Sequence, residues 1–230
     1  MEKTALVEVQ DLSFCYTDGT QALNGIDFRL HEGETVALFG PNGSGKTTFL
    51  HLLVGLLNGE GSIHVCGREI NSGSVEFART QIGLLFQDSN DQLFMPTVEQ
   101  DVAFGPSNQG HAQPETEQRV RTALDSVGLS SLRERAPHHL SAGQKRRVAL
   151  AGILAMEPRV ILFDEPATFL DPPSRADLIQ TLQTLPQAKV LVTHDVDLAQ
   201  ALAHRAVFFE QGRIVAEGSV DDVARERSWL

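Results

Sequence analysis

The sequence is poor in cysteine, in aromatic residues other than phenylalanine, and in long apolar runs. Its 230 residues include 2 cysteines, 1 tryptophan and 1 tyrosine. Cys15 and Cys66 show neither CxxC spacing nor an adjacent histidine cluster, so we expect unpaired, buried thiols rather than a disulfide or a metal site. The longest nearly apolar runs, 49–57 and 148–156, are about half as long as the roughly 18 residues that span a bilayer. No segment is predicted to cross a membrane alone.

Positive charge is also scarce. The chain has 19 lysines and arginines against 30 acidic residues, a formal net charge of -11. Such a protein repels a phosphate backbone, and its cations adjoin one another chiefly at Lys145–Arg147, so general nucleic-acid binding is not expected. The N-terminal residues lack a basic segment followed by an apolar stretch of signal-peptide length, which predicts a protein that stays in the cytoplasm.

The apolar patterns predict an α/β fold. Residues 5–16 and 61–70 alternate apolar and polar side chains, which is typical of half-buried strands in an antiparallel sheet. Residues 34–40, 159–165 and 188–195 carry short, almost wholly apolar runs, which favour strands covered on both faces of a mostly parallel sheet. The length and the 41% hydrophobic content suit one compound domain.

The remaining segments predict helices and a hairpin. A helix is expected over about 46–57, directly after the first buried strand. From about residue 87 to 135 the pattern is that of a helical insertion with breaks at Pro96, Pro106 and Pro114. The tail is expected to form a β-hairpin around Gln211 and Gly212.

A phosphate-binding loop is the most specific motif. The segment GPNGSGKTT matches G-x-x-x-x-G-K-[ST] and lies between a predicted strand and a predicted helix, as the motif requires. Gly43 and Gly45 would let successive N–H groups surround phosphates at the positive end of the helix. Lys46 would reach the β- and γ-phosphates. The predicted nucleotide-binding residues here are Gly40, Pro41, Asn42, Gly43, Ser44, Gly45, Lys46, Thr47 and Thr48.

Polar residues follow three further predicted strands. Asp164 would hold Mg²⁺ together with the hydroxyl of Thr47, and Glu165 would polarise the attacking water. His194 could touch the γ-phosphate and order Glu165, although a single histidine is more often structural. Gln87 could likewise be an ordinary surface amide. Tyr16 is as well explained by the core as by a platform for adenine.

The segment LSAGQKRR, residues 140–147, is typical of a helix start that holds an anion. Its three consecutive cations are unfavourable at that end of a helix, because the helix dipole is positive there. We therefore regard a purely structural role for Lys145–Arg147 as strained, with simple solvation as the alternative.

The chain resembles the ATP-binding subunit of ATP-binding cassette (ABC) transporters over nearly its whole length. The resemblance is carried, in this order, by GPNGSGKTT, Gln87, LSAGQ, RVILFDEP, TFLD and His194. Residues 91–106 and 144–158 are similar to its energy-coupling factor branch, whose best-known members serve cobalt and nickel uptake. The resemblance implies a P-loop NTPase (RecA-like) core with an N-terminal antiparallel β subdomain. Residues 1–230 would form a single ATP-binding domain, with a helical subdomain at about 88–155.

The resemblance also implies an ATP hydrolase that uses ATP and Mg²⁺ and drives separate transmembrane subunits from the cytoplasmic face of the cell membrane. Two ATPase subunits, identical or paralogous, would pair head to tail, with each ATP held between one phosphate loop and the other subunit's signature segment. Ser141, Gly143 and Gln144 would supply that second half. Gln87 would join Lys46, Glu165 and His194 in catalysis, and Thr47 and Asp164 at the metal.

The sequence departs from the family pattern at two places. Ala142 replaces the first glycine of L-S-G-G-Q, and we expect function to survive because alanine suits a helix start unless φ must be positive. Thr168 and Phe169 alter the stretch before Asp171, the residue that links the two sites in the family.

Residues 91–106 mix exposed apolar residues with acids, which predicts a groove that docks a short helix of the membrane partner.

Three alternatives stay open: an importer of the biotin or other vitamin type, a soluble ABC ATPase of repair or translation, and a regulatory module that does not turn over. Repair members carry a long coiled coil inside the cassette and translation members carry two cassettes, and neither feature is found here. Glu165 and His194 argue against the third, because a binding module has no need to activate water.

Overall fold

The computed structural model describes residues 4–227, which group into two compact units. Of the described residues, the first unit contains 4–84, 159–165 and 186–227, and the second contains 85–158 and 166–185. Residues 1–3, on which the prediction about the N-terminus falls, and residues 228–230 lie outside the described part. Within the described range no helix is long and apolar enough to cross a membrane.

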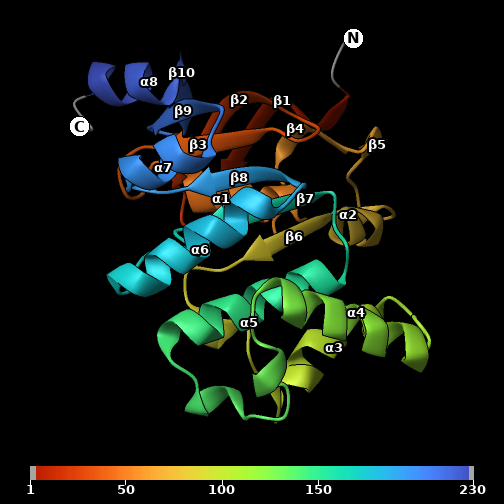
Figure 1. The fold of residues 1–230 in the computed structure, drawn as a ribbon. Coiled ribbons are helices and arrows are strands. Elements are labelled where there is room, and N and C mark those ends of the chain that lie inside the picture. The colour runs from red at the N-terminus through yellow and green to blue at the C-terminus, as the bar shows by residue number, and fades with distance from the viewer. Residues whose placement is uncertain (1–3, 228–230) are drawn as a thin grey trace. The chain divides into compact units, whose positions relative to one another are not determined.

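The first unit contains two sheets and the helices that cover them (Figure 1). A four-stranded antiparallel sheet has the order β2-β1-β4-β5 and confirms the predicted N-terminal sheet. Its strands are β1 (Ala5–Cys15), β2 (Gln21–His31), β4 (Glu60–Val65) and β5 (Arg68–Glu69). Cys15 is exposed and Cys66 half-buried, so the predicted burial of both thiols was wrong; each lies where β1 or β4 passes into a turn.

The second sheet has the order β10-β9-β3-β8-β7-β6. Strands β3, β7, β8 and β9 run parallel, and β10 returns antiparallel to β9. Its strands are β3 (Thr35–Phe39), β6 (Ile82–Leu85), β7 (Val160–Asp164), β8 (Ala188–Val192), β9 (Arg205–Glu210) and β10 (Arg213–Gly218). Every residue of β3, β7 and β8 is buried, because both faces of this sheet are covered. The predicted hairpin is present, with Gln211 and Gly212 both at positive φ.

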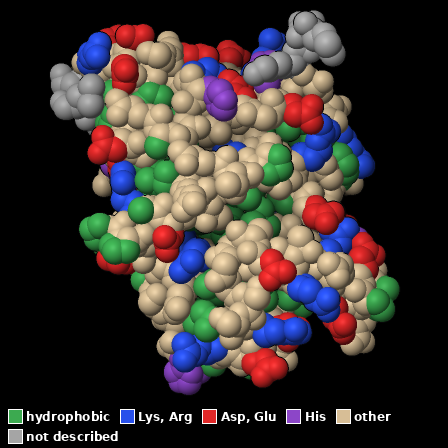
Figure 2. Space-filling view, in the orientation of Figure 1, with side chains coloured by type: hydrophobic (Ala, Val, Ile, Leu, Met, Phe, Trp, Pro, Cys, Tyr) green, Lys and Arg blue, Asp and Glu red, His purple; other side chains and the backbone are tan. Residues whose placement is uncertain are grey.

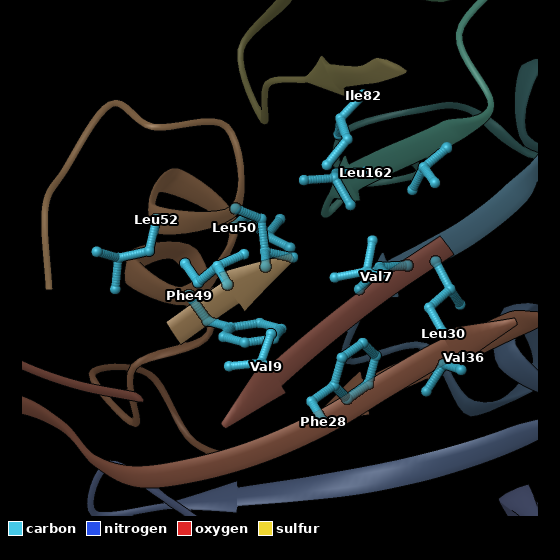
Figure 3. Packing of buried hydrophobic residues seen from close by; sticks show 14 of the residues in the cluster. Val7, Val9, Phe28, Leu30, Val36, Phe49, Leu50, Leu52, Ile82 and Leu162 are labelled. Atoms are coloured by element: carbon cyan, nitrogen blue, oxygen red, sulfur yellow. The ribbon is translucent and has the colours of Figure 1, made fainter. Parts of the chain in front are cut away.

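Helix α1 (Lys46–Leu53) lies between the two sheets and joins their cores. Its Phe49 is fully buried and contacts Phe28 of β2, with ring centroids 5.3 Å apart (Figure 3). Phe49 also contacts Phe209 of β9, with ring centroids 5.5 Å apart. The helix is shorter than the predicted 46–57. Gly55 has a φ of 64° and would place any Cβ 2.3 Å from a methyl carbon of Val75, so the chain must turn there although the apolar pattern continues.

The other helices of the first unit are α2 (Val75–Gln81), α7 (Val196–Leu202) and α8 (Val220–Glu226). Helices α7 and α8 pack against β3 and β9 through a second apolar cluster that includes Phe39 and Phe208. The two apolar clusters cover the parallel strands, and their packing fixes the positions of the strand ends.

The second unit is helical, and α5 (Ala142–Ala155) packs against both α3 (Val98–Asn108) and α4 (Gln113–Ser126). It also contains α6 (Pro172–Thr184) and three short 3₁₀ turns, η1 (Ser89–Asp91), η2 (Ser130–Leu132) and η3 (Pro137–His139). The predicted break at Pro106 was wrong, since α3 continues through it to Asn108. Pro106 lies in the last turn, where a proline removes few of the hydrogen bonds of the helix.

Phe169 has an unusual conformation in the segment that precedes α6. Its φ is 65°, in the left-handed region, and its side chain is 88% exposed. A residue with a Cβ is disfavoured there by about 1–2 kcal/mol, and an exposed ring regains little by packing.

We predict that Phe169→Gly stabilises the protein by about 1 kcal/mol, which is about 2–4 °C in Tm for a chain of this length. Thermal unfolding followed by circular dichroism measures the shift. Phe169→Ala is the matched control, because it removes the ring but keeps the Cβ, and it should give no such gain. A lower Tm for the glycine variant would contradict the strain argument.

Candidate functional site

The phosphate loop, residues 40–48, connects the buried strand β3 to α1. Gly40 has a φ of 137°, and a Cβ there would lie 2.1 Å from the carbonyl oxygen of Phe209. Gly45 has a φ of 105°, and a Cβ would lie 2.4 Å from the carbonyl oxygen of Ala22. Only glycine fits at these two positions, so the tight turn into the N-terminus of α1 is a consequence of local sterics.

The side chains of the loop are arranged around the first turn of α1. The Lys46 ammonium donates to the carbonyl oxygens of Gly40 and Pro41 at 2.7 and 2.9 Å. Ser44 is 3% exposed, and its hydroxyl has no hydrogen-bond partner among the residues of the described chain. The first N–H groups of a helix likewise lack partners within the helix. An anion with several oxygens, such as a phosphate, fits this set of donors.

Burial lowers the pKa of Lys46, and the charges of Glu165 and Asp164 oppose that shift. The ammonium is thus held in a region of low polarity next to two carboxylates. The electrostatic attraction of a cation for phosphate is stronger in such a region than in water, because there is less solvent to screen it.

A carboxylate at the end of the parallel strand β7 contacts the loop. The Thr47 hydroxyl donates to Oδ2 of Asp164, the last residue of β7, at 2.9 Å. Burial raises the pKa of Asp164, while the hydrogen bond from Thr47 and the charges of His51 and Lys46 oppose that shift. One hydroxyl and one carboxylate are hard oxygen ligands of the kind that Mg²⁺ prefers.

No group of three or more histidine, cysteine or acidic side chains that could hold a metal occurs among residues 4–227. A magnesium ion held by Thr47 and Asp164 would share these two oxygen ligands with phosphate and water. That agrees with the usual habit of Mg²⁺ at nucleotide sites, where one or two protein groups suffice.

Glu165 and His194 form a second pair beside the loop. Nε2 of His194 lies 3.2 Å from Oε1 of Glu165 and 3.0 Å from Oδ1 of Asn42. Glu165 has a φ of 48°, a strained conformation for a residue with a Cβ, and its N–H donates to the carbonyl oxygen of Val192 in β8. Strain of this kind persists where the surroundings impose it, and it is common at sites of chemistry.

Tyr16 also reaches the loop. Its hydroxyl lies 2.9 Å from Oγ1 of Thr48, its ring is 39% exposed, and it packs edge-on against Phe14. The structure thus brings together nearly all the predicted site residues of the first unit. They are Tyr16, the loop residues 40–48, Asp164, Glu165 and His194.

Gln87 and the signature segment belong to the second unit. Ser141 is the N-cap of α5, and it forms a capping box with Gln144, in which each side chain bonds the other's main chain. Ala142 is the first residue of the helix, whereas a Cβ on Gly143 would lie 2.5 Å from the hydroxyl of Ser174. Glycine is therefore needed at 143 and alanine is tolerated at 142.

Two buried polar residues of the second unit were not among the predicted site residues. Arg146 is 4% exposed and donates to two main-chain carbonyls, and Asp101 is 9% exposed with one carboxylate oxygen, Oδ2, that has no hydrogen-bond partner among the described residues. The dipole argument gave a signal for Arg146, since it made the cations of α5 hard to explain as structure. Asp101 gave none, because a single acid in a helix is ordinarily solvated.

Comparisons with known proteins identify the family of the chain. Residues 23–168 match the family model described as ABC transporter. A relative from Gloeobacter violaceus with a provisional assignment as an ABC transporter ATP-binding protein is 51% identical over 225 residues, 96% of this chain and 92% of that one. The energy-coupling factor transporter ATP-binding protein EcfA of Methanothermobacter thermautotrophicus is 43% identical over 227 residues, 96% of this chain and 73% of that one.

Two solved structures show the same fold. CbiO1 from Clostridium perfringens, described as part of the ABC transporter complex cbiONQ, has a TM-score of 0.88 at 35% identity and covers 98% of this chain and 92% of its own. The cassette MJ0796, described as a dimer in a post-hydrolysis state with ADP and Pi, has a TM-score of 0.82 at 27% identity, with 93% and 98% covered. The chain therefore belongs to the ABC transporter family, as one of its ATP-binding and ATP-hydrolysing subunits.

Proposed function

We propose that the chain is the ATPase subunit of an energy-coupling factor importer, and that it closes on ATP as a head-to-tail pair to drive a separate transmembrane partner. The observation that carries the catalytic part is the meeting of Thr47 with Asp164 and of His194 with Glu165 beside one phosphate loop. The similarity to EcfA and CbiO1 supports the choice of branch.

The roles of the residues follow from their positions. Lys46 would exchange its two carbonyl partners for the β- and γ-phosphates. Thr47 and Asp164 would hold Mg²⁺, which when bound neutralises phosphate charge. Glu165 would orient and polarise the attacking water, with His194 keeping the carboxylate in place. The N-terminus of α5 and the Ser141 hydroxyl would face the γ-phosphate that is bound by the second subunit.

Cobalt or nickel is the cargo that the resemblance favours, and CbiO1 itself belongs to a complex named cbiONQ. A vitamin importer of the biotin type is the second candidate, because the cargo does not contact the ATPase and so leaves no mark on this chain.

The docking surface for the membrane partner is proposed at a hollow of about 140 Å³ in the second unit, lined by residues of α3, α5 and the segment before α3. Phe94 is 62% exposed and Phe104 42% exposed, and their rings contact edge to face at 4.9 Å. Two exposed aromatic rings beside a hollow are typical anchors for a partner helix. Figure 2 shows acidic and basic side chains interspersed over the face in view.

Asp101 indicates the charge of the docking helix. This carboxylate lines the hollow, and its Oδ1 accepts from the N–H groups of Phe94 and Met95, both at 3.0 Å. Burial raises the pKa of Asp101, so its charge is costly in the free subunit. A lysine or arginine from the partner would offset that cost and pair with Oδ2.

The catalytic proposal is tested by two substitutions. We predict that Lys46→Ala abolishes ATP hydrolysis, because the direct phosphate contact is lost. Glu165→Gln should keep ATP binding and lose turnover by about 10²–10⁴-fold, the usual contribution of a general base. For both variants, a coupled assay measures ATP turnover and a fluorescent ATP analogue measures ATP binding. The exposed Glu210→Gln is the matched control and should turn over normally. A fall of less than about fivefold in Glu165→Gln would assign the base to another residue.

The docking proposal predicts that the double variant Phe94→Ser, Phe104→Ser binds the transmembrane subunit at least about tenfold more weakly. The reason is that two aromatic anchors, which the partner would bury in the complex, are lost. ATP binding and Tm should stay near wild type, since both rings are exposed in the subunit. Leu56→Ser is the control, because Leu56 is 51% exposed in the first unit, outside the hollow. A collapsed thermal transition in the double variant would instead place the rings in the core.

Asp101→Asn separates charge from packing in the same hollow. The pKa of Asp101 is higher in the folded state than in the unfolded state, so the protein loses stability as the pH rises from the unfolded-state pKa through the folded-state pKa. The amide variant should therefore be at least as stable as wild type at pH 7, with the difference shrinking towards low pH, and it should bind the partner more weakly. Undiminished partner binding would remove the proposed cation.

A further inference from the structure

The phosphate loop packs against the main chain of two other segments of the first unit. These segments are the start of β2, residues 22–24, and the turn between β9 and β10, residues 209–212. The close approaches of Gly40 and Gly45 described above are made to them, one glycine to each segment. The catalytic roles proposed above use neither segment.

Gly212 joins all three segments through its own peptide groups. Its N–H donates to the carbonyl oxygen of Ser44 in the loop at 3.2 Å. Its carbonyl oxygen accepts from the N–H of Asn24 in β2 at 2.8 Å. The turn is therefore tied to the backbone of the loop itself, and not to one of its side chains.

The position requires glycine for two separate reasons. Gly212 has a φ of 74° and follows Gln211 with a φ of 48°, two positive values that a tight hairpin turn demands. In addition, a Cβ at this position would lie 2.8 Å from the carbonyl oxygen of Ala22 and 3.2 Å from the Cα of Leu23. Both obstacles are main chain, so a side chain at 212 would push the turn away from the loop.

The hairpin does not need these outward bonds in order to close. Arg213 of β10 already pairs with Glu210 of β9 directly across the turn, and the antiparallel ladder continues from there. The N–H and the carbonyl of Gly212 are thus available for the loop and for β2. Their bonds hold the turn to its neighbours, and that contact has a consequence for the loop.

The bond from Gly212 fixes the plane of one peptide group of the loop. A trans peptide is planar, and its C=O and N–H point in opposite directions. Holding the carbonyl of Ser44 to the turn therefore directs the N–H of Gly45 away from the turn. Gly45 is the N-cap of α1, where main-chain N–H groups are the donors that bind an anion.

We propose that Gly212 is a positioning residue for ATP: through its main chain, the β9–β10 turn sets the orientation of the peptide between Ser44 and Gly45, and with it the affinity of the loop for phosphate. Gly212 acts through the loop. The inference rests on the proposed phosphate-binding role of residues 40–48.

The first test compares Gly212→Ala with Gly67→Ala. Gly67 has a φ of 78°, so alanine is strained there to a similar degree, but no atom of the described chain lies within 4 Å of a Cβ at that position. Hydrogen–deuterium exchange of nucleotide-free protein should become faster at about residues 40–50 in Gly212→Ala and stay unchanged there in Gly67→Ala. Unchanged exchange at 40–50 in Gly212→Ala, or an equal increase in both variants, would overturn the positioning role.

The second test separates KM for ATP from kcat. A donor that is misaligned in the ground state and in the transition state alike weakens binding in both, so Gly212→Ala should raise KM at least about fivefold with kcat within about twofold of wild type. A merely structural defect would instead reduce the folded fraction, which lowers the apparent kcat and leaves KM unchanged. An unchanged KM would contradict the proposal.

Lys46→Ala distinguishes the two ways in which the inference can fail. If that variant bound ATP as wild type does, the loop would not be the phosphate site, and the proposed function would fail together with the link from Gly212 to ATP. The exchange result would then decide by itself whether Gly212 orders the loop.

Asn24→Pro replaces Gly212→Ala in both measurements if the alanine variant lacks a cooperative thermal transition. It removes the N–H that bonds the carbonyl of Gly212 and places no new group against the loop. Asn24 lies in the edge strand β2 and its N–H bonds the turn, so proline there spares the ladder to β1. Exchange at 40–50 and KM should again rise, and wild-type values of both would overturn the role given to the turn.

Discussion

The hydrogen bond between Thr47 and Asp164 connects the two halves of the candidate site. It can form because β3 and β7 both run parallel to β8, one on each side of it, so their carboxyl ends lie at one edge of the sheet. The phosphate loop leaves β3, the two carboxylates follow β7, and His194 follows β8. Strand order and direction therefore decide which side chains can share a nucleotide, and the buried residues of α1 keep these strands in place.

The site holds the positive charge of Lys46 close to the negative charge of Asp164. Burial disfavours the charged forms of Lys46 and Asp164, while their mutual attraction and hydrogen bonds favour them. In the proposed function, phosphate would replace the loop carbonyls as the partner of the lysine. In the second unit, the buried Arg146 and Asp101 are likewise costly alone, and each makes sense once a loop or a partner is considered.

The local motifs were readable from the sequence because each has a short-range cause. The glycine spacing of 40–48, the apolar runs of β3, β7 and β8, and the serine that caps α5 all specify structure within a few residues. Features set by distant neighbours were not readable. The end of α1 depends on Val75 behind Gly55, the exposure of Cys15 depends on where β1 passes into a turn, and the bonds of Arg146 depend on a loop about 60 residues upstream.

The central claim is that each active site is built from two chains. The most direct measurement is the specific ATPase activity of the wild-type protein over a wide range of protein concentration, with light scattering in ATP on the same samples. The account predicts that specific activity falls on dilution in step with the loss of the dimer. Constant specific activity in samples that scatter as monomers with ATP bound would contradict it.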